Sequence, residues 1–416
     1  MSIVHPNPLE VAAADAILED SPTEVVMDDI AGSAAAIVEA SDQVSEISRN
    51  VEELGDAAVS VENYVNRFLE SVSVENWNPR IAHQYQIGME AILNTCGVSV
   101  PPGVFCASFE AAGVSQTNEE NREETKGKSE GVIKSLWRSF LEMLTRLWDN
   151  IQNFTAFLGK STSGLRRAAD NLKARVTKAK SDNLVSSTDK LSGVWASYLA
   201  EDIGGGNSIN RPPVIALQKM AEKGIGFTTA WHASYLSAVT EMAEGNFASM
   251  DKGNSSMKDL ERSLGELLNP ALAKYNGQWP GGYTMLVQRK PDHLDRFEIK
   301  IKHEPDRGIE PKRLELTAIN DIATELRTIA DSIDTEMKAM MDGKQKIDAV
   351  KRKMETAIKS GEKPINGNVV KLASALMSDM MTGPRKVLPL VTGACFNAIK
   401  HCNESLHTYK AAGKAK

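Results

Sequence analysis

Lysine is missing from the first 125 residues of this 416-residue chain. Residues 1–110 hold 18 Asp and Glu against three Arg, a net charge of −15. The whole chain has 55 acidic and 48 basic residues, so residues 111–416 have 37 and 45, a net charge of +8. The overall charge of −7 is therefore the sum of two parts of opposite sign.

Cysteine, aromatic residues and long apolar runs are scarce as well. Four cysteines are too few for a disulfide scaffold, so we expect free thiols in a reducing compartment. No run approaches the roughly 20 apolar residues of a membrane span, and the N-terminus lacks the basic and apolar regions of a signal peptide. Aromatics make up 6% while Ala, Met, Lys and Glu are plentiful, a composition that favours helix.

Motifs for catalysis, cofactors and metals are missing too. The chain has no Gly-Lys-Ser/Thr phosphate loop, Gly-x-Ser-x-Gly or HExxH motif, and Gly204–Gly206 and Gly281-Gly282 are interpreted as turns. Cys395 and Cys402 share a predicted helix face from which His401 points away, so buried thiols are expected there and not a zinc site. We therefore expect no catalytic, cofactor-binding or metal site, and no enzyme.

Apolar spacing predicts a mainly α protein, with long amphipathic helices packed as a bundle. A seven-residue pattern from Ile30 to Val72 predicts one helix, or two broken near Gly55, packed within its own domain or against a partner. A helix is also expected from Pro79 to about Asn94. The apolar face of residues 132–158 carries two Trp and two Phe and indicates core packing, with a membrane interface as the alternative.

The rest of the chain is predicted to be helical with one small antiparallel β insertion near 283–316. Further helices are expected at 165–180, 191–202, 214–222, 227–244, 257–268, 319–343, 347–361 (basic), 369–381 and 387–409. Alternation with period two predicts strands at 283–288, 297–302 and 314–316. We expect four regions: an acidic helical leader (1–110), a linker (111–131), a pair of amphipathic and basic helices (132–182) and a helical domain (183–416).

One predicted helix has a strongly basic face, made of Arg166, Arg167, Lys173, Arg175, Lys178 and Lys180. Such a face is commonly just solvated. Because residues 111–416 are net positive, non-specific contact with nucleic-acid phosphates is the functional alternative.

The charge boundary coincides with the sequence Ser108-Phe109-Glu110-Ala111, which follows a Pro-Pro segment and precedes a polar stretch. The pattern is a small residue, any residue and Glu. It lies in the extended, exposed context that a proteolytic site requires, because a protease binds the backbone in extended form. Two more copies, Ser60-Val61-Glu62 and Ser73-Val74-Glu75, lie on the predicted heptad helix and are expected to be less accessible.

The order of these features resembles the internal head proteins of large tailed bacteriophages. The resemblance covers residues 30–180 and includes the acidic leader, the helix at Gly88–Leu93, the Ser108–Ala111 site and Ile133–Trp137. It implies that a prohead protease removes the leader by cutting the Glu110–Ala111 bond. It further implies a structural protein inside the capsid, reached from the host cytoplasm during assembly, with capsid or scaffold proteins and packaged DNA as partners.

Two alternatives come from other functional classes. A cytoplasmic interaction protein would use residues 30–73 and 319–358 for coiled-coil contacts. An effector enzyme delivered with the DNA would place its activity in residues 183–416, near His293 and His303.

Overall fold

The computed structural model describes residues 22–71, 73, 75, 79–95, 118–184, 191, 213–244, 272–289, 297–304, 311–360 and 367–411. The helices are α2 (Pro22–Ser71), α3 (Pro79–Thr95), α4 (Asn118–Lys178), α5 (Pro213–Glu244), α7 (Leu316–Asp342), α8 (Lys344–Ser360) and α9 (Gly367–His407). The strands are β1 (Ala179–Leu184), β2 (Gly277–Trp279), β3 (Tyr283–Arg289), β4 (Phe297–His303) and β5 (Tyr409–Ala411). The mainly α prediction with a small β insertion is confirmed.

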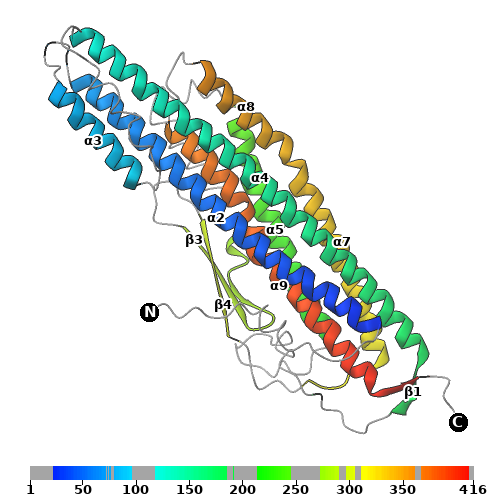
Figure 1. Ribbon diagram of the computed structural model, residues 1–416. Coiled ribbons are helices and arrows are strands. Elements are labelled where there is room, and N and C mark those ends of the chain that lie inside the picture. Colours follow the sequence, from blue (N-terminus) through cyan, green and yellow to red (C-terminus); the bar gives the residue numbers. More distant parts are fainter. Residues whose placement is uncertain are drawn as a thin grey trace.

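Long helices form a closed ring in an elongated bundle (Figure 1). Around this ring α2 contacts α4, α4 contacts α7, α7 contacts α5, α5 contacts α9, and α9 contacts α2 again. Buried apolar side chains from all of these helices belong to one hydrophobic core. The acidic N-terminal part and the basic remainder of the chain therefore share a single core.

Side-chain bonds show that α7 and α8 run antiparallel to α4. Each step toward the C-terminus on α4 is matched, to within one residue, by a step toward the N-terminus on α7 and α8. The bonded pairs are Thr145 with Lys351, Thr155 with Met341, Thr162 with Asp334, and Arg166 with Asp331. The register continues across Gly343, so α8 extends the line of α7 along α4.

The α5–α7 contact is parallel. Gln218 bonds to Glu325 at 2.9 Å, and Thr229 bonds to Glu336 at 2.7 Å. Both helices advance together by three turns between these bonds. A closed ring with an odd number of helices must contain at least one pair of neighbours that run in the same direction, and α5 with α7 is such a pair.

The predicted heptad helix is a single helix, α2, that packs within its own chain. Six of its buried side chains occupy predicted apolar positions, which confirms that part of the pattern, while Ala57 and Glu62 are buried outside it. We call the six the α2 seam: Ala40, Val44, Val51, Ala58, Val61 and Val65. Helix α2 does not break at Gly55. A Cβ added there would lie 3.5 Å from Cε2 of Phe140 on α4, so small residues let the two helices approach closely.

Helix α4 is one helix where two were expected. The predicted interruption between Gly159 and Gly164 is wrong, because Leu158 and Leu165 stay on the same buried stripe and a single helix carries both. The stretch before residue 132, which was predicted to be a linker, is helical from Asn118. Core packing of the Trp-bearing face is confirmed, since Trp137 and Trp148 are 3% and 6% exposed. Within the described residues, no helix has the length and apolar character that crossing a bilayer requires.

Helices α5 and α9 are also continuous where breaks were predicted. Gly224 lies against Val391 of α9, so the absence of a side chain there serves close packing and α5 does not end. Helix α9 contains Pro384 and Pro389 in its interior. Its Gly383 lies against the Trp231 ring. The expected helices at 191–202 and 257–268 lie, apart from Leu191, outside the described residues.

The β insertion is an antiparallel sheet of order β2-β3-β4, in which Leu286 pairs with Lys300. Its two longer strands were predicted, but the expected strand at 314–316 is wrong because Leu316 begins α7. The observed third strand is β2, joined to β3 through Gly281 and Gly282 with φ of 81° and 75°, which confirms the predicted turn. A second, unpredicted pairing joins β1 to β5.

Candidate processing and phosphate-contact sites

The basic face of α4 is partly engaged in contacts with α7. The Arg166 guanidinium donates from Nε and Nη2 to Oδ1 of Asp331 at 2.9 and 2.7 Å, and it also bonds to Asp334. These carboxylates raise the pKa of Arg166. One turn earlier, Thr162 donates to Asp334 at 2.7 Å. Arg166 therefore fixes α4 to α7.

Arg175 has a similar internal role at the end of the bundle. Its Nη1 donates to Oδ1 of Asn403 on α9 at 2.6 Å, and burial lowers its pKa. Of the other predicted contact residues, Arg167 and Lys178 are exposed and Lys173 is half-buried, while the Lys180 side chain lies outside the described residues. Phosphate contact by this face stays a prediction. The residues best placed for it are Arg167, Lys173 and Lys178, because their side chains reach solvent.

Charge reverses along the α7–α8 line. The charged residues of α7 are Asp321, Glu325, Asp331, Asp334, Glu336 and Asp342 against Arg327 and Lys338, a net of −4. Those of α8 are Lys344, Lys346, Lys351, Arg352, Lys353 and Lys359 against Asp348 and Glu355, a net of +4. The acidic half faces the basic end of α4, where Arg327 also pairs with Asp170 at 3.0 Å. The sequence shows a basic α8, but the alignment of α8 with α7 comes only from the fold.

The predicted processing site Ser108, Phe109, Glu110 and Ala111 lies outside the described residues. Helix α3 ends at Thr95 before it, and α4 begins at Asn118 after it. Tyr85 of α3 stacks on Tyr64 and Phe68 of α2. Its hydroxyl bonds to Ser129 of α4 at 3.1 Å, and burial raises its pKa to about 12. Both helices that flank the site are thus held to the bundle.

The two other copies of the protease motif differ in accessibility. Glu62 and Val61 are buried inside α2, which confirms the expectation for that copy. The expectation is wrong for the second copy, because α2 ends at Ser71 and both Ser73 and Glu75 are exposed. The heptad pattern runs to residue 72, one residue past the end of α2, and so gives no sign that the helix stops before the second copy.

A buried cation connects the N-terminal acidic part to the C-terminal helix. Arg385 of α9 is 6% exposed, and burial lowers its pKa to about 10 against the opposing effect of Asp379 and of Asp42 on α2. The carboxylates favour the charged guanidinium, and burial disfavours it. Sequence reasoning missed this group, since nothing local to α9 indicates that residue 42 lies beside it.

Other buried ionisable groups lie between α5 and α7. Burial raises the pKa of Glu336, which accepts a hydrogen bond from Thr229, and lowers the pKa of His232 to about 4. A histidine buried in this way is neutral at pH 7.

The C-terminal histidine and cysteines have structural surroundings. Cys395 and Cys402 are buried free thiols, as predicted, and burial raises their pKa values. His401 lies 2.7 Å, Nε2 to oxygen, from the Lys312 carbonyl. In the part of the chain that the structure describes, no three His, Cys, Asp or Glu side chains form a metal-binding group. His303 stacks on Tyr283 with centroids 4.3 Å apart, and His293 lies outside the described residues.

The sequence profile of the phiKZ-like phage internal head proteins matches residues 39–403, from α2 to α9. The chain belongs to this family. The match confirms the resemblance and extends it over the C-terminal half, which carried no assigned motif. As a phiKZ-like internal head protein, the chain is a bacteriophage protein of the head interior. No curated protein and no solved structure matches it.

Proposed function

We propose that this internal head protein is a non-enzymatic structural component packaged in the capsid, and that the prohead protease cuts its Glu110–Ala111 bond during assembly. Family membership supports the location. The motif at the charge boundary supports the cut, as does its place between two helices that are anchored to the bundle. Hydrolysis adds water across the bond and leaves a carboxylate on Glu110 and an ammonium on Ala111.

The proposed cut lies between two parts of the chain that have opposite charge. The −15 of residues 1–110 opposes the approach of DNA phosphates, whereas the +8 of residues 111–416 favours it. Non-specific phosphate contact is then proposed for Arg167, Lys173 and Lys178, together with the basic α8. Because α2 packs against α4 and α9 in the ring, the cut alone does not release the leader.

Mass spectrometry of purified mature particles tests the cut. We expect peptides whose N-terminus is Ala111 and no peptide that spans residues 110 and 111. In phage that carries Glu110→Gln the spanning peptide should appear, while the matched change Glu119→Gln in the first turn of α4 should leave cleavage intact. A spanning peptide in wild-type particles at the level of neighbouring peptides contradicts the proposal.

A further inference from the structure

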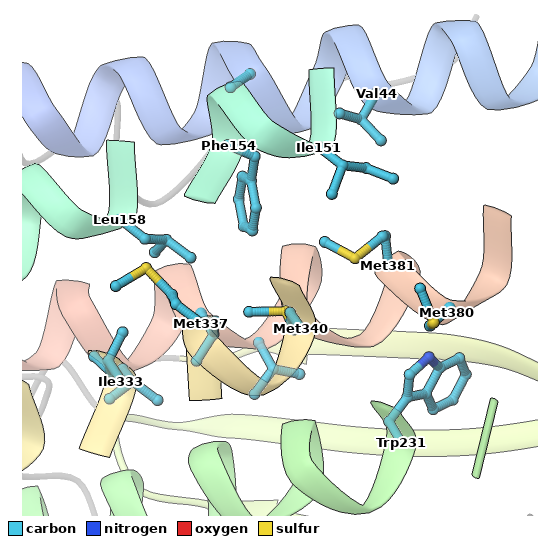
Figure 2. Packing of buried hydrophobic residues seen from close by; sticks show 14 of the residues in the cluster. Val44, Ile151, Phe154, Leu158, Trp231, Ile333, Met337, Met340, Met380 and Met381 are labelled. Carbon is cyan, nitrogen blue, oxygen red and sulfur yellow. The ribbon is translucent and has the colours of Figure 1, made fainter. Parts of the chain in front are cut away.

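Helix α2 belongs to the fold of the rest of the chain, although it lies on the N-terminal side of the proposed cut. It closes the ring by filling the groove between α4 and α9. Figure 2 shows Val44 of α2 beside Ile151 of α4, within the same core that holds Trp231 of α5. Without α2, this groove would expose its apolar floor to water.

Apolar and aromatic contacts hold α2 in the groove, and a buried charge of α9 lies near it. The α2 seam is at most 3% exposed along its length, and Gly55 brings the helix close to Phe140. At one end Asp42 lies in the field of the buried Arg385. At the other end Tyr64 and Phe68 stack on Tyr85, which is bonded to α4.

The scissile bond lies far along the chain from these contacts. Glu110 is 39 residues beyond Ser71, the last residue of α2, and it lies in the segment between α3 and α4. Cutting there breaks no contact made by the α2 seam. It removes only the covalent tether, which turns an intramolecular contact into a bimolecular one.

We propose that α2 stays docked between α4 and α9 after the Glu110–Ala111 bond is cut, so that the processed protein is a complex of two chains. This inference rests on the proposed cleavage and adds that the N-terminal fragment stays bound to the rest of the protein. Docking also protects the Ser60–Glu62 motif, because it keeps Val61 and Glu62 buried in a helix and a protease needs extended backbone. A second cut after the exposed Glu75 would break the chain between α2 and α3 and still leave α2 in its groove.

The test replaces residues 107–113 of the full chain with the recognition sequence of a site-specific protease. After complete cleavage at about 10 µM protein, both fragments should elute together in gel filtration at the position of the uncut chain. Hydrogen exchange of residues 40–65 should stay within about twofold of the uncut chain. Separate elution, or loss of protection in residues 40–65, overturns the inference.

A matched pair of variants assigns the retention to the α2 seam. Val61→Asp places a charge in the core, whereas Asn63→Asp places the same charge on the exposed face of α2. After cleavage, the Val61→Asp fragments should separate and the Asn63→Asp fragments should co-elute. Co-elution of both would place the retaining contact outside the seam and overturn the assignment. If Val61→Asp prevents folding, the exchange comparison on the unsubstituted chain still decides.

The engineered protease keeps this test independent of the phage. If mature particles contain an intact Glu110–Ala111 bond, the proposed processing fails while the docking measurement is unaffected. If the bond is cut in particles but the fragments separate in vitro, the processing stands and the retention of α2 fails.

Discussion

Two contacts in the same ring are built from different side chains. The α2 seam consists of Ala and Val and approaches α4 at Gly55. The α5–α9 contact instead packs aromatic rings, with Trp231 against Gly383 and its Nε1 donating to the Asp379 carbonyl at 2.8 Å. A helix that packs through small Ala and Val side chains can move away from its neighbours with little change in side-chain conformation. Helices that pack through interlocked aromatic rings must first repack those rings. The comparison indicates that α2 is held less firmly in the ring than α5 and α9 are held to each other.

The largest effect is expected from Gly383→Ala. A Cβ there would lie 2.5 Å from Cγ of Trp231, and that ring is fully buried beside Phe227 and Tyr235. With no room to move, overpacking should cost about 3 kcal/mol despite the better helix propensity of alanine. Urea unfolding followed by tryptophan fluorescence measures the loss. A loss of unfolding free energy below about 1 kcal/mol would show that the α5–α9 contact can accommodate the added methyl group. The difference between this contact and the α2 seam would then disappear.

The buried His232 of α5 is expected to make the stability of the protein sensitive to acid. Its folded pKa of about 4 lies below the unfolded value of about 6.5, so its contribution to stability is complete above pH 6.5 and is lost as pH falls toward 4. From pH 7 to 5 we expect His232→Gln to lose about 2 kcal/mol less than the wild type. Urea titrations of both proteins at the two pH values give this difference. Equal losses would mean that His232 is not neutral in the folded protein.

On the seam side, Val51→Ala should have a smaller effect. It removes two fully buried methyl groups between α2 and its neighbours, worth about 1.5 kcal/mol. In the cleaved two-chain protein it should also weaken docking of the leader fragment about tenfold. Titration of the separated fragment measures this. An effect as large as that of Gly383→Ala would make the two contacts equivalent.

Arg166→Ala tests whether the ion pairs between α4 and α7 contribute to stability. Losing the bonds to Asp331 and Asp334 should cost about 1 kcal/mol, because the guanidinium is partly exposed and its pairs are screened. Lys178→Ala, an exposed change on the same helix, serves as the control and should be near neutral in stability. For DNA, salt-dependent binding should respond to Lys178→Ala. Equal stability losses in both variants would contradict the internal role of Arg166.

The smallest effect is expected from Gly55→Ala, and it has the opposite sign. The added Cβ meets Phe140 at an ordinary contact distance of 3.5 Å, so the gain in helix propensity of about 0.5–1 kcal/mol should remain. Thermal unfolding should show a higher Tm. With Gly383→Ala, this makes a pair of identical substitutions whose signs differ only because of what the new methyl group touches. A lower Tm would show that the seam is as tight as the aromatic contact.

Periodicity predicted most of the helices and the two longer strands, because burying one face imposes a pattern on neighbouring residues. It failed where a glycine or proline lies inside a helix that packs closely against another helix. Gly224 and Gly383 suggest breaks in the sequence but are places where another helix lies close. Leu316 alternates like a strand, yet it begins α7. At the candidate sites, the internal bonds of Arg166 and Arg175 could not be predicted, since their partners lie more than 150 residues away.

The parallel α5–α7 pair has a consequence for how the chain can vary. Because α5 and α7 run in the same direction, the chain must return along the bundle between Glu244 and Leu316. The β insertion lies in this part of the chain. The other ring helices are joined at shared ends, so they need no such detour. The directions of the helices therefore require that the connection from Glu244 to Leu316 spans the length of the bundle. Relatives should accumulate their insertions and deletions in that return path and keep the helix lengths nearly constant.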